Sequence, residues 1–218
     1  MDDVDVRAAR HAALGDPVRL RIVDELAVSD RAPVELRQRL GIESNLLAHH
    51  LDVLDDVGLI VRSRSSGDGR RRYVHLLRDI YDGVGLRPMI EPQRALFVCT
   101  ANSARSQLAA ALWRAITAAP ASSAGTHPAD RVHPGAVAAA RRAGVDLSTA
   151  SPTALSSLRR MPSLVITVCD RAYEELAAPD GWLHWSIPDP VPAGTKAAFD
   201  ATVTELTERM RTVTKAAA

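Results

Sequence analysis

The sequence predicts two domains, an α+β winged helix-turn-helix followed by an α/β domain with a parallel sheet. In the first half, three segments with helical apolar spacing precede two short strand segments joined by a glycine-containing turn. In the second half, short apolar strand segments alternate with helical segments, which is typical of a parallel sheet covered by helices. A chain of 218 residues is long enough for two small domains, each with its own apolar core.

Three helices are predicted in the first domain. The segment 18–26 has helical apolar spacing, with Pro17 in its first turn and Asp16 as its N-cap. A second helix is predicted over 33–40 and a third over 44–57, and each is ended by the glycine that follows it.

A β-hairpin follows these helices and completes the winged helix layout. Residues 59–61 and 73–75 read as its two strands, with a Ser-Gly-Asp-Gly turn between them. Residues 1–82 hold 13 basic and 15 acidic side chains, so binding to a nucleic acid needs a local basic patch. The hairpin supplies a cluster of arginines suited to phosphate groups: Arg62, Arg64, Arg70, Arg71 and Arg72.

The predicted boundary between the domains is the segment 83–94, which holds two glycines and two prolines and has no periodic pattern. The domains are therefore expected to span residues 1–82 and 95–218. In the second domain, strands are predicted over 95–98 and 164–168, and helices over 105–118, 136–143, 171–177 and 197–211.

The segment from Cys99 to Ser106 has the pattern of an oxyanion-binding loop. The predicted strand brings Cys99 to the carboxyl edge of the sheet, where ligands of such sheets bind, and a helix begins as the loop closes. The loop amides and the helix N-terminus would surround a tetrahedral anion. The predicted oxyanion-binding residues are Thr100, Ala101, Asn102, Ser103, Ala104, Arg105 and Ser106.

This loop predicts nucleophilic chemistry at a sulfur atom. The field that holds an anion also favours a thiolate, so we expect the pKa of Cys99 to be lowered. Arg105 can bind two oxygens of the anion, and Ser106 is placed to donate a hydrogen bond to the sulfur. An inert core cysteine is the alternative reading of Cys99.

With its C-x2-N-x2-R-S loop, residues 123–126 and residues 187–190, the segment from 95 to about 211 resembles low-molecular-weight protein tyrosine phosphatases and related arsenate reductases. The resemblance implies a low-molecular-weight phosphatase-like fold and makes Asp189 the general acid, a role that suits a carboxylic acid near the anion. Asp189 could instead simply begin a turn, because Asp-Pro favours turns.

Cys169 follows a predicted strand and is either a buried structural residue or a resolving thiol, as its position in the related reductases implies. Residues 173–179 contain no further cysteine, so an internal three-cysteine relay is excluded. Arsenate reduction would then need an external reductant: mycothiol, glutathione or a thioredoxin-type protein.

Three departures from the phosphatase pattern favour arsenate as the substrate. Gln107 stands where the tyrosine phosphatases usually have proline, Val191 replaces an aromatic residue, and Ala104 replaces a cysteine. Three functions stay open: a regulator fused to an arsenate reductase, a phosphatase fused to a DNA-binding domain, and a non-enzymatic transcription factor that responds to an oxyanion.

Residues 14–76 resemble arsenic-responsive repressors of the winged helix class, through the segments 14–22 and 50–60. The resemblance implies a recognition helix over 44–57 in the DNA major groove and a homodimer. Ser44, Asn45 and His49 are the candidate base contacts. The arsenite-sensing cysteines expected near 27–31 are missing, and the histidines have no metal-site spacing, so no metal site is predicted.

Composition narrows the remaining classes of protein. Two cysteines do not make a disulfide framework, and no apolar run is long enough to cross a membrane. The start of the chain is acidic and lacks the features of a secretion signal. We therefore expect a cytoplasmic protein with no bound cofactor, whose partners are DNA, arsenate or phosphate, and a thiol reductant.

Overall fold

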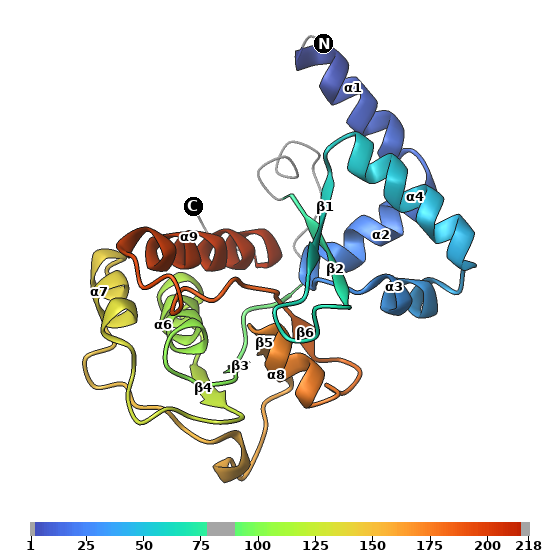
Figure 1. Cartoon of the computed structure of the whole chain (residues 1–218). Coiled ribbons are helices and arrows are strands. Elements are labelled where there is room, and N and C mark those ends of the chain that lie inside the picture. Colours follow the sequence, from blue (N-terminus) through green and yellow to red (C-terminus); the bar gives the residue numbers. More distant parts are fainter. Residues whose placement is uncertain (1–2, 78–89, 215–218) are drawn as a thin grey trace. The chain divides into compact units, whose positions relative to one another are not determined.

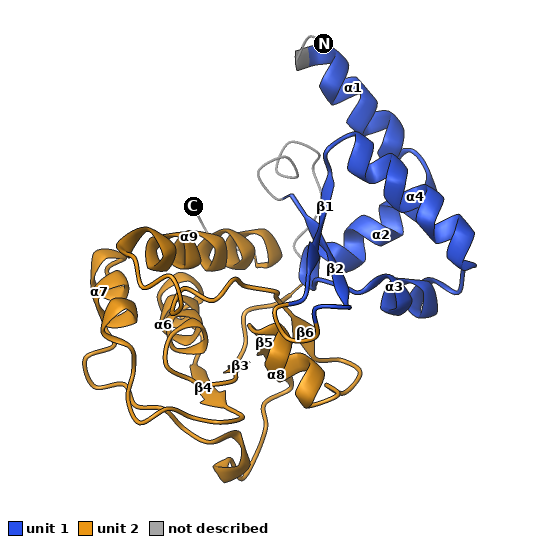
Figure 2. Cartoon of the chain, in the orientation of Figure 1, with its two compact units in different colours: residues 1–65, 69–89 blue, residues 66–68, 90–218 orange. Residues whose placement is uncertain are grey.

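The computed structural model describes residues 3–77 and 90–214. The chain divides into two compact units, drawn in different colours in Figure 2. Unit 1 comprises residues 1–65 and 69–89, and unit 2 comprises residues 66–68 and 90–218. Much of the predicted linker, 83–94, falls outside the described residues.

Unit 1 has the predicted winged helix layout, with one more helix before it (Figure 1). Its elements are α1 (Asp3–Leu14), α2 (Pro17–Val28), α3 (Pro33–Leu40), α4 (Ser44–Asp56), β1 (Ile60–Arg64) and β2 (Arg72–Leu76). The hairpin is antiparallel and pairs Ile60 with Leu76 and Arg64 with Arg72. The sequence did not predict α1, which buries Ala13 and Leu14 in the core of the unit.

The ends of the helices in unit 1 are set by the residues that the sequence indicated. The side chain of Asp16 accepts hydrogen bonds from the backbone N–H groups of Val18 and Arg19 and so caps α2. Gly41 ends α3 with a φ of 64°, and Gly58 follows α4 with a φ of 67°, a conformation that favours glycine.

Unit 2 contains a four-stranded, fully parallel sheet with the strand order β4-β3-β5-β6. Its strands are β3 (Ala95–Cys99), β4 (Ala121–Gly125), β5 (Leu164–Thr167) and β6 (Leu183–His184). Its helices are α6 (Arg105–Thr117), α7 (Pro134–Arg142), η2 (Leu155–Ser157, a single turn), α8 (Asp170–Glu175) and α9 (Lys196–Val213). The chain passes from β3 to β4 on one side and continues to β5 on the other, so β3 lies at a topological switch point.

Side chains alternate between the two faces of β3, and each face has its own partners. Leu96 and Val98 pack in a cluster that includes Leu176, just after α8. Phe97 points to the other face and contacts the rings of Trp113 and Trp185. α6 packs on β3 and β4 and also contacts α7 and α9, whereas α8 packs on β3 and β5. The sheet is thus covered on both faces, as Figure 1 shows.

No helix in the described residues combines the length and the apolar character needed to span a membrane.

Candidate active site

The candidate site is built where β3 ends and α6 begins. Cys99 is the last residue of β3, and the five residues 100–104 connect it to Arg105, the first residue of α6. Because β3 lies at the switch point of the sheet, this loop occupies the position in which parallel α/β sheets bind their ligands. The structure therefore brings the whole predicted oxyanion loop to one edge of the sheet.

The carbonyl groups of this loop are turned outward by a second segment of the chain. Residues 126–133 donate backbone hydrogen bonds to the carbonyls of Cys99, Thr100, Ala101 and Ser103, over distances of 2.8–3.1 Å. In a planar trans peptide the N–H group points away from the C=O group. Loop amides that follow these carbonyls therefore face the interior of the loop, which is the arrangement that binds a tetrahedral anion.

Gly125 allows this segment to approach the loop closely. A Cβ atom at Gly125 would lie 2.5 Å from the carbonyl oxygen of Thr100 and 3.0 Å from the Cβ of Asn102. Any side chain at this position would displace the loop backbone. The segment 123–126 was noted in the sequence only for its resemblance to the phosphatase pattern, and its packing role follows from the structure.

The sulfur of Cys99 lies at the base of the loop and has two hydrogen-bond partners. The Oγ atom of Ser106 is 3.0 Å from Sγ, and the backbone N–H of Asn102 donates to Sγ over 3.1 Å. Asn102 has a φ of 48°, in the left-handed region, and this bend aims its N–H at the sulfur.

Burial raises the pKa of the Cys99 thiol. The hydrogen bond from Ser106 and the charge of Arg105 act in the opposite direction, but they do not offset the loss of hydration. The lowered pKa expected from the sequence is therefore wrong in direction for this structure. Burial, which opposes the charged form of the sulfur, could not be read from the loop motif.

Arg105 links the loop to the segment that precedes α9. One of its terminal nitrogens donates to the carbonyl of Ile187 (3.0 Å), and the other contacts a carboxylate oxygen of Asp189 (2.9 Å). The guanidinium is almost fully buried, whereas Asp189 is more than one-third exposed. A guanidinium has five N–H donors, so these two bonds leave capacity for an anion in the loop.

Cys169 lies next to the loop but is not one of its residues. It is buried at the N-terminus of α8, and its Sγ atom is 3.3 Å from Oγ1 of Thr100, the residue that follows Cys99. The structure thus places a second sulfur beside the residue that follows Cys99, a position that the sequence could only suggest by resemblance.

A buried polar group beside Cys169 was not singled out from the sequence. Asp170 contacts Nε2 of His184 (3.2 Å), and the other ring nitrogen of His184 lies 2.9 Å from Oγ1 of Thr167. Burial alone would raise the pKa of Asp170, but hydrogen bonds from His184 and Ser186 lower it to about 2. Among the described residues, no group of histidine, cysteine, aspartate or glutamate side chains could hold a metal ion.

Asp170 should therefore stabilise unit 2 in a pH-dependent way. Because its folded pKa is below its unfolded value, its contribution of about 2 kcal/mol is present above about pH 4 and is lost as the pH falls toward 2. Urea unfolding followed by tryptophan fluorescence reports on unit 2, which contains all three tryptophans. The stability difference between wild type and Asp170→Asn should shrink across this range, and a difference that stays constant would contradict the assignment.

In unit 1, the candidate DNA-binding residues are divided between α4 and the hairpin. Ser44, Asn45 and His49 are exposed on α4. The exposed arginines of the hairpin are Arg64, Arg70, Arg71 and Arg72. Arg62 differs from these, because it contacts Asp52 at 2.6 Å and Asp55 at 3.3 Å on α4.

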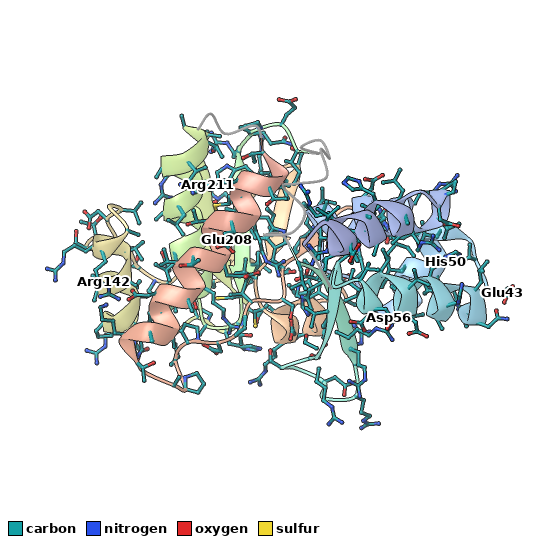
Figure 3. All side chains as sticks on the ribbon, turned by 90° about the horizontal axis from the view of Figure 1, so that it is seen from above. Glu43, His50, Asp56, Arg142, Glu208 and Arg211 are labelled. Atoms are coloured by element: carbon teal, nitrogen blue, oxygen red, sulfur yellow. The ribbon has the colours of Figure 1, made fainter. Side chains whose placement is uncertain are left out.

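The exposed face of α4 is acidic over its C-terminal half. Figure 3 labels Glu43 and Asp56, which lie at its two ends, and Asp52 and Asp55 are also exposed. The helix carries no lysine or arginine. Arg62, which the sequence predicts as a phosphate contact, is paired with two of these carboxylates in this structure.

Comparisons with known proteins agree with this architecture. Residues 94–217 match the model of the low molecular weight phosphotyrosine protein phosphatase family, and residues 14–63 match a helix-turn-helix domain. The first match spans more than half of the chain, so the protein belongs to the low molecular weight phosphotyrosine protein phosphatase family. It joins a helix-turn-helix DNA-binding domain to a domain of this phosphatase and arsenate reductase type.

Several solved structures are similar to just over half of the chain. A YwlE mutant from Bacillus subtilis is 24% identical with a TM-score of 0.50, and the match covers 56% of this chain and 95% of that one. A low molecular weight protein tyrosine phosphatase from T. tengcongensis is 22% identical with a TM-score of 0.50, covering 56% and 97%. An arsenate reductase from Archaeoglobus fulgidus is 26% identical with a TM-score of 0.47, covering 54% and 95%. A comparison with curated proteins finds no match.

Proposed function

We propose that unit 2 is an arsenate reductase that uses the sulfur of Cys99 as its nucleophile, and that unit 1 is a DNA-binding transcriptional regulator. The observation that carries this proposal is the position of the Cys99 sulfur at the base of a loop whose amides face inward. The pair formed by Arg105 and Asp189 supplies a cation for the oxyanion and a carboxyl group next to it, at a separation of 2.9 Å.

The first step joins sulfur to arsenic. Arsenate is held by the loop amides and by Arg105, and Cys99 attacks the arsenic atom while one oxygen departs. Asp189 acts as the general acid and gives a proton to that oxygen, which leaves as water. Because burial raises the pKa of Cys99, the thiol loses its proton during this step, and a basic oxygen of the bound dianion accepts it.

The second step reduces arsenic. A second thiol attacks the sulfur of Cys99, the electron pair of the sulfur–arsenic bond stays with arsenic, and trivalent arsenite departs. The two sulfurs are left as a disulfide, so the two electrons gained by arsenic come from two thiols. We propose Cys169 as the resolving thiol, because it contacts the residue next to Cys99, and an external thiol or thioredoxin-type protein then reduces the disulfide.

The surroundings of the loop favour a small inorganic oxyanion over a phosphotyrosine. In the part of unit 2 that the structure describes, Phe97, Trp113, Tyr173, Trp185 and Phe199 are buried and Trp182 is partly buried. Trp182 packs against the cluster of Leu96 and Val98. The residue after Asp189-Pro190 is Val191, so the segment around Asp189 carries no aromatic ring that could stack on a phosphotyrosine.

A paired assay separates the three candidate functions. The purified chain is given arsenate with mycothiol, glutathione or a thioredoxin system, and in parallel an aryl phosphate. Arsenite production that needs a thiol supports the reductase, and preferential hydrolysis of the aryl phosphate supports a phosphatase. Tight phosphate binding without turnover of either substrate would make unit 2 an oxyanion sensor.

For unit 1, we propose operator binding by a homodimer, with the hairpin arginines on the DNA backbone and Ser44, Asn45 and His49 near base edges. No cysteine is present at 27–31, so arsenite sensing by thiolates in that segment is not part of the proposal. The oxyanion or redox state of unit 2 is the proposed signal.

The double substitution Asp52→Asn and Asp55→Asn should strengthen DNA binding. It removes two negative charges from α4 and releases Arg62, the partner of both carboxylates. We expect roughly fivefold tighter binding to mixed-sequence duplex DNA at low salt, and a salt dependence steeper by about one phosphate contact. Asp56→Asn is the matched control for charge on the same helix. Unchanged affinity in the double variant would show that the hairpin does not contact phosphates through Arg62.

A further inference from the structure

Gln107 is a buried side chain on which three oxygen atoms converge. It lies in the first turn of α6, directly after Ser106, and is only 5% exposed. Its Nε2 atom is 3.1 Å from the backbone oxygen of Asn102, 3.1 Å from Oδ1 of Asn102, and 3.0 Å from the backbone oxygen of Ser151. One amide group therefore connects the loop to a segment more than forty residues away in the sequence.

The partners of these oxygens fix the orientation of both amide side chains. Backbone carbonyls can only accept hydrogen bonds, so the end of Gln107 that faces them must be its NH2 group. The Oδ1 atom of Asn102 also accepts from the backbone N–H of Thr153 at 2.8 Å, which identifies that atom as oxygen. The NH2 group of Asn102 must then face Ser106, where it donates to Oγ over 2.7 Å.

This chain of bonds determines where the proton of Ser106 goes. The hydroxyl of Ser106 has a single proton, and its oxygen already accepts from Asn102. Once Cys99 ionises, its sulfur can only accept, and the proton of Ser106 is then directed to it across 3.0 Å. A serine in this orientation stabilises the thiolate, because the anion has no proton of its own to share.

Gln107 also holds Asn102 in the left-handed backbone conformation. Asparagine adopts this region, here at a φ of 48°, more often than most residues with a Cβ atom, but only as a minority conformation. Gln107 binds Asn102 at both its backbone carbonyl and its side-chain carbonyl, so it restrains both the bend of the loop and the rotamer. This bend aims the N–H of Asn102 at the sulfur.

We propose that Gln107 is a positioning residue for the Cys99 nucleophile, acting through Asn102 and Ser106. Its amide holds Asn102 so that the Ser106 hydroxyl donates to the sulfur and the loop amides face the oxyanion. The proposal rests on the proposed role of Cys99 as the nucleophile of unit 2.

The test compares Gln107→Met with Gln107→Glu. Methionine keeps the volume but has no N–H donor, and glutamate replaces the donor by a carboxylate that faces three oxygens. Alkylation of Cys99 by iodoacetamide is followed against pH, and phosphate affinity is measured by protection from alkylation. We expect phosphate to bind about tenfold more weakly to the methionine variant. The pH profile of Cys99 alkylation should move to higher pH in that variant. Both changes should be larger in the glutamate variant. The matched control is Gln38→Met, at an exposed position on α3.

A role in packing alone predicts that Gln107→Met behaves as wild type, and that result would overturn the proposal. Should the methionine variant fail to fold by tryptophan fluorescence, Gln107→Lys is used, because its ammonium group offers donors to the same three oxygens. Phosphate binding is then expected to return to within about threefold of wild type, and a greater loss in a folded lysine variant would also overturn the proposal. A different result would contradict the proposed function of unit 2. In that case neither phosphate nor arsenate would protect Cys99 from alkylation in the wild-type protein.

Discussion

Replacement of Cys99 by serine is expected to abolish arsenate reduction and to leave oxyanion binding intact. The hydroxyl of serine does not ionise at neutral pH and cannot supply the electrons that reduce arsenic, so turnover should fall by a factor on the order of 10⁴ or more. The loop amides and Arg105 do not depend on the sulfur, and phosphate should therefore still bind. Arsenite release and phosphate affinity, measured on the same preparation, check both halves of this expectation.

Cys169→Ser is the control for this experiment. It removes the second sulfur, which lies 3.3 Å from Thr100, and leaves the nucleophile in place. It should still form the covalent arsenic adduct on Cys99, and should depend entirely on external thiol for its release. If the Cys99→Ser variant still reduces arsenate, the sulfur of Cys99 is not the nucleophile.

Replacement of Asp189 by asparagine should have the second-largest effect, and it should act on turnover rather than on binding. Asparagine keeps the shape of the side chain but has no carboxylic proton to give to the departing oxygen, so turnover should fall by about 10²–10⁴-fold. Asparagine keeps a side-chain oxygen for the contact with Arg105, which is 2.9 Å in the native protein. Phosphate affinity should therefore stay close to that of wild type in the variant.

The control for Asp189→Asn is Asp200→Asn on α9. Asp200 pairs with Arg142 on α7, which is labelled in Figure 3, and this partly exposed pair lies outside the loop and the segment around Asp189. Its replacement should leave turnover unchanged. Equal losses of turnover and phosphate affinity in Asp189→Asn would show that Asp189 only orients Arg105 and does not transfer a proton.

Features set by local sequence were predicted well. Asp16 caps α2 because a carboxylate at this position satisfies the first backbone N–H groups of the helix. The loop from Cys99 to Ser106 was located because a buried strand, a short spacing and a helix start are all local signals. That Arg105 and Asp189 lie next to each other could be inferred only from the family resemblance, because 84 residues separate them in the chain.

Features that depend on distant partners were missed or misjudged. β4, with the sequence Ala-Ser-Ser-Ala-Gly, has no β-branched or aromatic residue and becomes a strand because it pairs with β3. The pairing of Arg62 with Asp52 and Asp55 was not predicted, because these carboxylates lie on another element. The pKa of Cys99 was misjudged because burial depends on the packed site. Gln107 was noted as a departure from the phosphatases, but its three oxygen partners are visible only in the folded loop.

Protection of Cys99 from alkylation by an oxyanion tests the proposed site most directly. The intact chain is treated with iodoacetamide over a series of arsenate or phosphate concentrations, and the modified cysteine is identified by peptide mass spectrometry. We expect modification of Cys99 to slow and to reach a limit as the oxyanion saturates the loop. Modification at the same rate at every concentration, in a folded protein, would show that no oxyanion binds above this sulfur.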